Sequence, residues 1–138
     1  MTSTLIDTNV FLDVVEERPE WFGWASRKIL EARGGGEIVI NPVVYAEAST
    51  PYEDETAFAR FLDAAGFLRE DLPFGCAFRA AKAHLEYRLK GGVSATALPD
   101  FFIGAHTAYR GYRLLTRDAT RFRTYFPEIE IIAPDTHP

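Results

Sequence analysis

The chain has 138 residues, 47% hydrophobic and 25% charged, which is the composition of one ordinary globular domain. No apolar run approaches the roughly 18–20 residues of a membrane span, and no secretory signal opens the sequence. Cys76 is the only cysteine, which excludes an internal disulfide and favours the cytoplasm. The net charge of −5 argues against a broad basic face for nucleic acid. We expect a single domain over residues 1–138.

Short apolar runs alternate with helical patterns along the first half of the chain. The expected elements, in order, are a strand at Ser3–Asp7, helices at Asn9–Glu16 and Trp21–Arg33, a strand at Glu37–Asn41, a helix from Pro42 and a helix at Asp54–Ala65. Glycines after Arg33 and Ala65 supply the helix ends, and Pro42 suits a first helical turn.

The second half continues the same alternation. The expected elements are a weak strand at Phe67–Arg69, helices at Phe74–Lys90 and Pro99–Arg110, a strand at Tyr112–Thr116, a short helix from Ala119 and a strand at Ile129–Ile132. The helix at 74–90 carries an apolar stripe of the kind that packs on a core, formed by Phe78, Ala81, Leu85 and Leu89. Alternating strands and helices favour an α/β fold with a mostly parallel sheet covered on both faces.

Four acidic residues, far apart in the sequence, are expected to meet at one edge of this sheet. Asp7 ends the first strand, and Asp118 lies two residues beyond the strand at 112–116. Glu47 and Asp100 fall in the first turns of their helices. Ligands of open α/β sheets bind beyond the carboxyl ends of the strands. Taken singly, each acid also has a structural explanation, as a helix cap, a partner of the helix dipole or an exposed helix residue.

Carboxylates held close together repel one another unless a cation neutralises them. The histidines, His84, His106 and His137, lack the spacing of a zinc site. Oxygen-only ligands suit Mg²⁺ or Mn²⁺, and such ions activate water and polarise phosphoryl oxygens. Phosphodiester hydrolysis is therefore the expected chemistry. Four of the 20 acidic residues are these candidates, and bound cations would offset their charge. The net charge of −5 therefore argues only weakly against a metal-dependent nuclease.

Four segments carry a more specific signal, namely Ile-Asp-Thr-Asn-Val-Phe-Leu-Asp (6–13), Tyr-Ala-Glu-Ala-Ser (45–49), Leu-Pro-Asp-Phe-Phe-Ile-Gly-Ala-His (98–106) and Leu-Leu-Thr-Arg-Asp-Ala-Thr-Arg-Phe (114–122). In order and spacing the chain resembles the PIN-domain nucleases, and among them the VapC-type toxins of bacterial toxin–antitoxin pairs. The resemblance covers nearly the whole chain. Asp-Thr-Asn alone would be a weak signal.

The resemblance implies a PIN-domain-like α/β/α sandwich and an endoribonuclease that uses one or two Mg²⁺ or Mn²⁺ ions. The family's acidic positions fall on Asp7, Glu47, Asp100 and Asp118. Its usual polar neighbours of the site fall on Asn9 and Thr116. The resemblance also implies an RNA substrate, a homodimer and a cognate antitoxin whose C-terminal segment lies along a groove near the site.

The expected division of roles gives the principal metal to Asp7, Asp100 and Asp118, while Glu47 binds a second ion or orients the attacking water. Thr116 is expected to hydrogen-bond a ligating carboxylate. Candidate contacts to the RNA backbone, which could equally be solvated surface, are Arg117, Arg121, Arg79 and Lys82. Three alternatives stay open: an RNA-processing PIN nuclease without a toxin role, a receiver-like phosphotransfer protein and a module that only binds protein.

Overall fold

A computed structural model describes residues 2–138. The strands are β1 (Thr4–Ile6), β2 (Ile38–Ile40), β3 (Phe67–Arg69), β4 (Arg113–Leu115) and β5 (Glu130–Ile132). The helices are α1 (Thr8–Val15), α2 (Phe22–Arg33), α3 (Pro42–Ser49), α4 (Glu55–Ala65), α5 (Phe74–Leu89), α6 (Leu98–Arg110) and α7 (Thr120–Tyr125). Every element expected from the sequence is present, with ends that differ by at most one residue. Within these residues, no helix has the length and apolarity to span a membrane.

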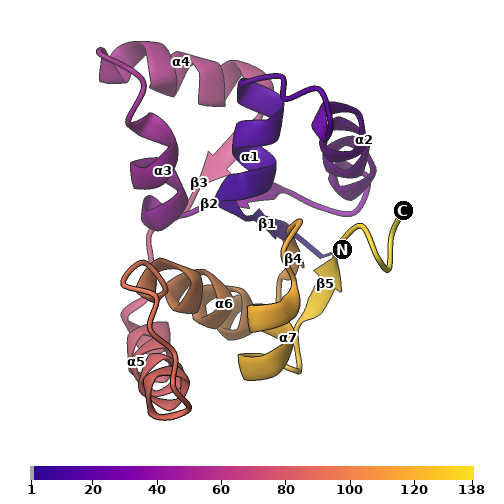
Figure 1. The fold of residues 1–138 in the computed structure, drawn as a ribbon. Helices are drawn as coiled ribbons and strands as arrows, with labels where there is room; N and C mark the ends of the chain where they lie inside the picture. Colours follow the sequence, from indigo (N-terminus) through magenta and orange to yellow (C-terminus); the bar gives the residue numbers. More distant parts are fainter. Residues whose placement is uncertain (1) are drawn as a thin grey trace.

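The strands form one sheet in the order β3-β2-β1-β4-β5. The expected mostly parallel sheet is confirmed, and every pair of neighbouring strands is in fact parallel. In the centre, Leu5 pairs with Val39 on one side and with Leu114 on the other. Helices α1–α4 cover one face of the sheet and α5–α7 cover the other (Figure 1). The expected three-layer α/β/α sandwich is therefore confirmed.

The strand order places a ligand site between β1 and β4. From β1 the chain builds the sheet outward through β2 and β3, and then returns to add β4 and β5 on the other side of β1. Because parallel crossovers are right-handed, the two directions send their helices to opposite faces, and a crevice opens at the carboxyl ends where the direction changes. The residues that follow β1 and β4 are held together there, since the Asp7 amide donates to the carbonyl of Leu115 at 2.9 Å.

Local sequence signals set the ends of the helices that border this crevice. Asp7 is the N-cap of α1, and Asn41 is the N-cap of α3, where its Oδ1 accepts from the Val44 amide at 3.0 Å. Gly111 ends α6 with φ +69°, a left-handed conformation that glycine adopts without steric strain. The capping residues thus fix where the chain turns from strand to helix beside the site.

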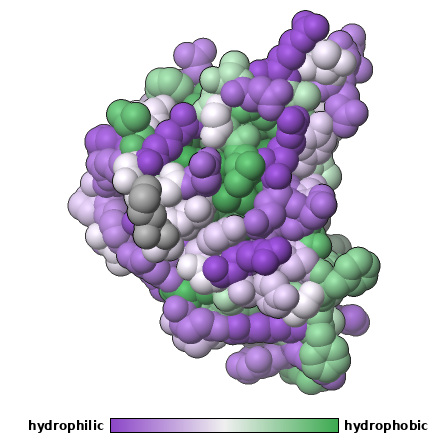
Figure 2. Space-filling view, turned by 180° about the vertical axis from the view of Figure 1, so that it is seen from behind, coloured by the Kyte–Doolittle hydropathy of each residue, from purple (hydrophilic) through white to green (hydrophobic). Residues whose placement is uncertain are grey.

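The prediction that the apolar stripe packs α5 on the core is wrong. Phe78 is 73% exposed and Leu89 is 77% exposed. The buried face of α5 carries smaller side chains instead, namely Cys76, Ala80 and Ala83. Small residues let α5 approach α6 closely, which leaves the large apolar side chains pointing away from the sheet. Figure 2 shows hydrophobic side chains protruding at the lower end of the molecule, where α5 lies.

Candidate active site

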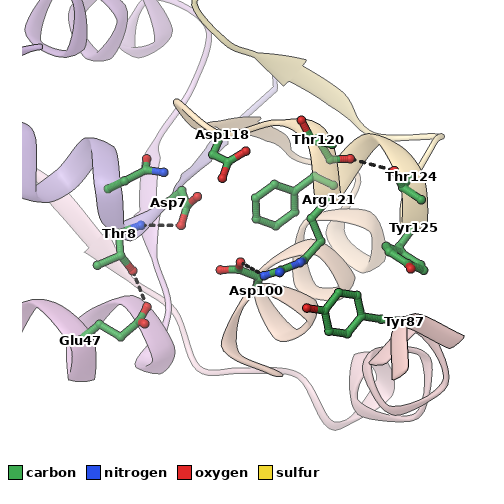
Figure 3. A pocket seen from close by; sticks show the side chains of 12 residues that line it. Asp7, Thr8, Glu47, Tyr87, Asp100, Asp118, Thr120, Arg121, Thr124 and Tyr125 are labelled. Carbon is green, nitrogen blue, oxygen red and sulfur yellow. Dashed lines mark hydrogen bonds and ion pairs between the residues drawn. The ribbon is translucent and has the colours of Figure 1, made fainter. Parts of the chain in front are cut away.

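A pocket of about 490 Å³ opens at the carboxyl edge of the sheet, beside β1 and β4 (Figure 3). The four acids singled out in the sequence all line it, although they come from four separate segments. The lining residues are Asp7, Thr8, Asn9, Glu47, Tyr87, Asp100, Asp118, Thr120, Arg121, Phe122, Thr124 and Tyr125. The pocket therefore combines carboxylates on one side with aromatic rings and a guanidinium on the other.

Asp7 is the most deeply buried of the four acids, with 5% of its surface exposed. Its Oδ1 accepts from the Thr8 amide at 2.7 Å, and its Oδ2 accepts from the Thr116 hydroxyl at 2.8 Å. Burial raises the pKa of this carboxyl to about 7, and the nearby carboxylates of Asp100 and Glu47 add to the rise. The two hydrogen bonds act in the opposite direction. Asp7 thus both caps α1 and presents a carboxyl that lacks a compensating positive charge.

Glu47 reaches the pocket from α3 and is exposed. Its Oε1 accepts from the Thr8 hydroxyl at 2.6 Å. Thr8 therefore holds two acids at once, Asp7 through its backbone amide and Glu47 through its side chain (Figure 3). Sequence reasoning missed Thr8, although its place directly after the capping Asp7 put its hydroxyl at the start of α1, next to the strand end.

Asp100 lies in the first turn of α6 and forms an ion pair across the pocket. The Arg121 Nη1 donates to Asp100 Oδ2 at 2.6 Å. Burial raises the pKa of Asp100, while the Arg121 guanidinium opposes the rise and the carboxylates of Glu47 and Asp118 reinforce it. The Arg121 guanidinium also lies over two rings, 4.9 Å from the centroid of Tyr87 and 5.7 Å from that of Phe101.

Asp118 is exposed and sits on the turn between β4 and α7. Its amide donates to the Thr116 hydroxyl at 3.1 Å, and the Arg117 amide donates to Asn9 Oδ1 at 3.3 Å. The first bond closes the turn at residues 116–118, and the second ties it to the start of α1. Thr116 and Asn9, the two expected polar neighbours, thus lie beside the acids, and Thr116 contacts Asp7 directly.

The four candidate RNA contacts lie in different surroundings, and only Arg121 is among the residues that line the pocket. Arg117 pairs with the fully buried Asp13, its Nη2 lying 3.2 Å from Oδ1. Arg79 forms an ion pair with Glu128. The Lys82 ammonium lies 5.1 Å from the centroid of the Phe78 ring. The ion pairs of these two arginines could not be predicted from the sequence, because each arginine is far along the chain from its acidic partner.

The donor atoms of the pocket fit a hard divalent cation, since its acids offer only oxygens and no histidine or cysteine is among its lining residues. Among residues 2–138, however, no three His, Cys, Asp or Glu side chains converge closely enough in this conformation to hold an ion. The side-chain contacts explain the difference, because Thr8 holds Glu47 and Arg121 holds Asp100. The residues therefore fit a divalent cation in their chemistry and line one pocket, but in this conformation their carboxylates do not meet at one point.

The fold is similar to that of several solved structures. VapBC2 from Rickettsia felis bound to a DNA fragment from its promoter matches with a TM-score of 0.71 and 16% identity, over 95% of this chain and 98% of that one. DNA-bound VapBC from Salmonella typhimurium matches with a TM-score of 0.70 and 20% identity, over 96% and 98%. A toxin–antitoxin complex from Klebsiella pneumoniae matches with a TM-score of 0.65 and 20% identity, over 95% of this chain and 97% of that one.

At these identities the likeness shows a shared fold. No curated protein matches the chain. The model of the PIN domain family matches residues 4–126, a range that contains all four acids of the pocket and four of the five strands. The chain belongs to the PIN domain family.

Proposed function

We propose that this protein is a divalent-metal-dependent endoribonuclease that hydrolyses RNA phosphodiester bonds. One observation carries the proposal: Asp7, Glu47, Asp100 and Asp118 line a single pocket at the carboxyl edge of a parallel sheet. Membership of the PIN domain family supports a nuclease rather than a receiver-like phosphotransfer protein. The retained acids likewise favour an enzyme over a module that only binds protein.

In this proposal Asp7, Asp100 and Asp118 hold the principal ion, and Glu47 holds a second ion or orients the attacking water. Mg²⁺ or Mn²⁺ bound there would polarise a phosphoryl oxygen and lower the pKa of water. The support for a cation is the buried carboxyl of Asp7, whose pKa is raised by burial and by the neighbouring carboxylates of Asp100 and Glu47, because a bound cation would stabilise its ionised form.

Residues around the acids position them for this chemistry. Thr116 and Thr8 fix both oxygens of Asp7, which directs the carboxyl into the pocket. The half-exposed Arg121 is the cation in the pocket that could reach a phosphate group. We keep Arg117, Arg79 and Lys82 as candidate contacts to more distant phosphates.

The test is cleavage of a labelled RNA with and without Mn²⁺ by wild type, Asp7→Asn and Asp100→Asn. Both variants should lose at least 100-fold in rate, because each removes a charge from the metal site. Asp135→Asn is the matched control, since Asp135 is an exposed acid that pairs with Arg123 outside the pocket. Full activity in either site variant would contradict the assignment, as would metal-independent cleavage by wild type.

We further propose that the protein is the toxin of a type II toxin–antitoxin pair and binds a cognate antitoxin. The support is its structural likeness to VapBC complexes. Expression in a bacterial host should arrest growth, whereas Asp7→Asn should not, and co-expression of the protein encoded by the neighbouring reading frame should restore growth. Active RNA cleavage without growth arrest would instead favour an RNA-processing role.

We also propose that the protein forms a homodimer through the outer face of α5. The exposed stripe there is too apolar for a helix surface that meets only water, and it runs the length of the helix. The most exposed apolar side chains of α5 are Phe78 and Leu89 of this stripe, together with Phe74 in the first turn. A self-complementary patch of this kind suits a two-fold interface.

A further inference from the structure

Asp100 already has a cationic partner, and that partner comes from the neighbouring helix α7. Arg121 extends from α7, and its Nη1 donates to Asp100 Oδ2 at 2.6 Å. Arg121 is 27% exposed and Asp100 is 34% exposed, so the pair lies at the pocket surface. Figure 3 shows the guanidinium between Asp100 and Tyr87. An expected metal ligand is thus occupied by a side chain of the protein itself.

This ion pair and a metal ion would compete for the same carboxylate, because both are cations. An ion bound to the same carboxylate would lie roughly 2 Å from its oxygen. That position would bring two cations within a few ångströms of each other in a partly desolvated pocket, where their repulsion is poorly screened. In this conformation, no three acids among residues 2–138 converge closely enough to hold an ion.

The guanidinium is also held in the pocket by aromatic contacts, which it makes at the same time as the ion pair. Its carbon lies 4.9 Å from the Tyr87 centroid and 5.7 Å from the Phe101 centroid. Contacts between a guanidinium and aromatic faces do not require Asp100, so they can retain Arg121 in the pocket after the ion pair opens. The ion pair is partly exposed to solvent, and a bound divalent cation would carry twice the charge of the guanidinium that it replaces. A freed guanidinium beside the acids is well suited to a phosphate, which it can bind through two parallel hydrogen bonds.

We propose that Arg121 is an exchangeable counter-ion, which neutralises Asp100 in the metal-free protein and is released by the metal to bind the phosphate of the substrate. The inference rests on the proposed function, because it assigns a step in loading that same site. It makes metal binding and substrate binding cooperative: the ion that takes Asp100 frees the group that holds the phosphate. Arg121 is thus a substrate-binding residue only in the metal-loaded protein.

The first experiment measures Mn²⁺ affinity by calorimetry, without RNA, for wild type, Arg121→Gln and Arg123→Gln. Arg121→Gln should bind Mn²⁺ roughly three- to tenfold more tightly than wild type, because the competing cation is gone. Arg123→Gln is the matched control: it removes the same charge from the same helix, but Arg123 pairs with Asp135 instead. An equal gain in Mn²⁺ affinity in both variants would mean that the gain comes from long-range charge, and this would overturn the proposal. Arg121→Lys should remain close to wild type.

The second measurement assigns the gain to Asp100. In an Asp100→Asn background, Arg121→Gln should no longer tighten Mn²⁺ binding, because the competition acts through that carboxylate. A gain that persists there would overturn the proposal. Thermal melts of each metal-free variant show whether it is folded at the assay temperature, and Arg121→Lys supplies a readout with the charge retained if Arg121→Gln is unfolded.

The third measurement follows binding of a non-cleavable, 2′-O-methyl single-stranded RNA. With Mn²⁺ present, Arg121→Gln should weaken binding and reduce the salt slope by about one unit. In the presence of chelator, Arg121→Gln should change the salt slope of RNA binding little, because Arg121 is then paired with Asp100 in wild type. An unchanged slope in Mn²⁺ would overturn the phosphate role.

These results separate the inference from the proposed function. If Arg121→Gln binds Mn²⁺ more tightly but wild type does not cleave RNA, the exchange of Arg121 for metal at Asp100 is supported and the proposed nuclease function is rejected. RNA cleavage by wild type, with no gain in Arg121→Gln, would keep the nuclease and reject the exchange. Absence of Mn²⁺ binding in both proteins would reject both.

Discussion

Asp7 is the residue at which burial and charge repulsion act on the same carboxyl. Its side chain lies at the end of the central strand, almost without contact with solvent, and two neighbouring carboxylates face it. Hydrogen bonds from Thr8 and Thr116 only partly offset these effects. A carboxyl in this state holds a proton near neutral pH, or exchanges it for a cation. The residue that caps α1 therefore also carries a carboxyl whose charge changes near neutral pH.

The metal-free protein should lose stability as the pH rises from about 4 to about 7. An aspartate has its ordinary pKa of 3.8 in the unfolded chain, whereas Asp7 in the folded protein has a pKa of about 7. In that window the folded state holds a proton that the unfolded state has released, so its advantage is present at low pH and lost as Asp7 ionises. The loss should be on the order of a few kcal/mol.

Urea unfolding in chelator at pH 5 and pH 8 measures this loss for wild type and Asp7→Asn. The wild-type free energy of unfolding should fall relative to that of the variant between the two pH values. Parallel behaviour of the two proteins would mean that Asp7 does not carry the effect. Mn²⁺ at pH 8 should raise the melting temperature of wild type by mass action on the folded state.

Removing the Thr116 hydroxyl should raise the pKa of Asp7 further, because its hydrogen bond favours the ionised form. Thr116→Val should raise that pKa by roughly one unit, read by carbon NMR of the Asp7 carboxyl in the metal-free protein. Thr116→Ser keeps the hydroxyl and serves as the control. A pKa unchanged in Thr116→Val would show that the bond does not tune Asp7.

Each strand is only three residues long, so the helix ends and turns around the sheet position the side chains of the site. Asp7 and Asn41 act as caps where strand turns into helix, and Gly111 closes α6 before β4. Replacing a glycine by alanine should change the stability of the protein in opposite directions in such a turn and in a helix. The reason is that the backbone conformation differs between the two positions, although both have space for a Cβ atom.

Gly111 and Gly23 provide this comparison. A Cβ at either position would meet no atom within 4 Å, but Gly111 has φ +69° whereas Gly23 lies in helix α2. Gly111→Ala should destabilise the protein by about 1 kcal/mol, and Gly23→Ala should stabilise it by about 0.5 kcal/mol. Urea midpoints measure both. Shifts of the same sign would contradict the argument from backbone conformation.

At the scale of the molecule, the pocket lies where the two halves of the chain meet. Asp7 and Glu47 come from the half that builds β1, β2 and their helices, and Asp100 and Asp118 come from the half that returns to β4 (Figure 3). The outer face of α5 lies on the other side of the sheet from α1–α4 (Figure 1). A dimer through that face would leave the first four helices free for other partners.

Phe78→Ser should shift the protein from dimer to monomer, because it places a hydroxyl at an apolar interface. Size-exclusion chromatography with light scattering measures the mass. Leu30→Ser is the control, since Leu30 is equally exposed, at 73%, but lies on α2. A monomeric wild type, or a dimeric Phe78→Ser, would reject the α5 interface.

The order of elements and the position of the four acids could be predicted because both follow from local patterns. Apolar runs, caps and glycines mark the ends of strands and helices, and an acid just after a strand must lie near the sheet edge. The α5 stripe misled the prediction because a spacing of three and four residues marks an apolar face without saying what covers it. Small residues at Cys76, Ala80 and Ala83 give a weaker hydrophobic pattern, yet they are the ones that pack.

The sequence by itself determined the α/β alternation, the family resemblance and the four acids, because these depend on residue type and spacing along the chain. Only the tertiary structure decided which partner each charge takes. Arg117 and the buried Asp13, 104 residues apart, form a partly buried pair, and Arg121 turns to Asp100 rather than to solvent. The physical reason is that an ion pair depends on distance in space, and crossovers through the sheet bring together side chains whose separation along the chain carries no signal.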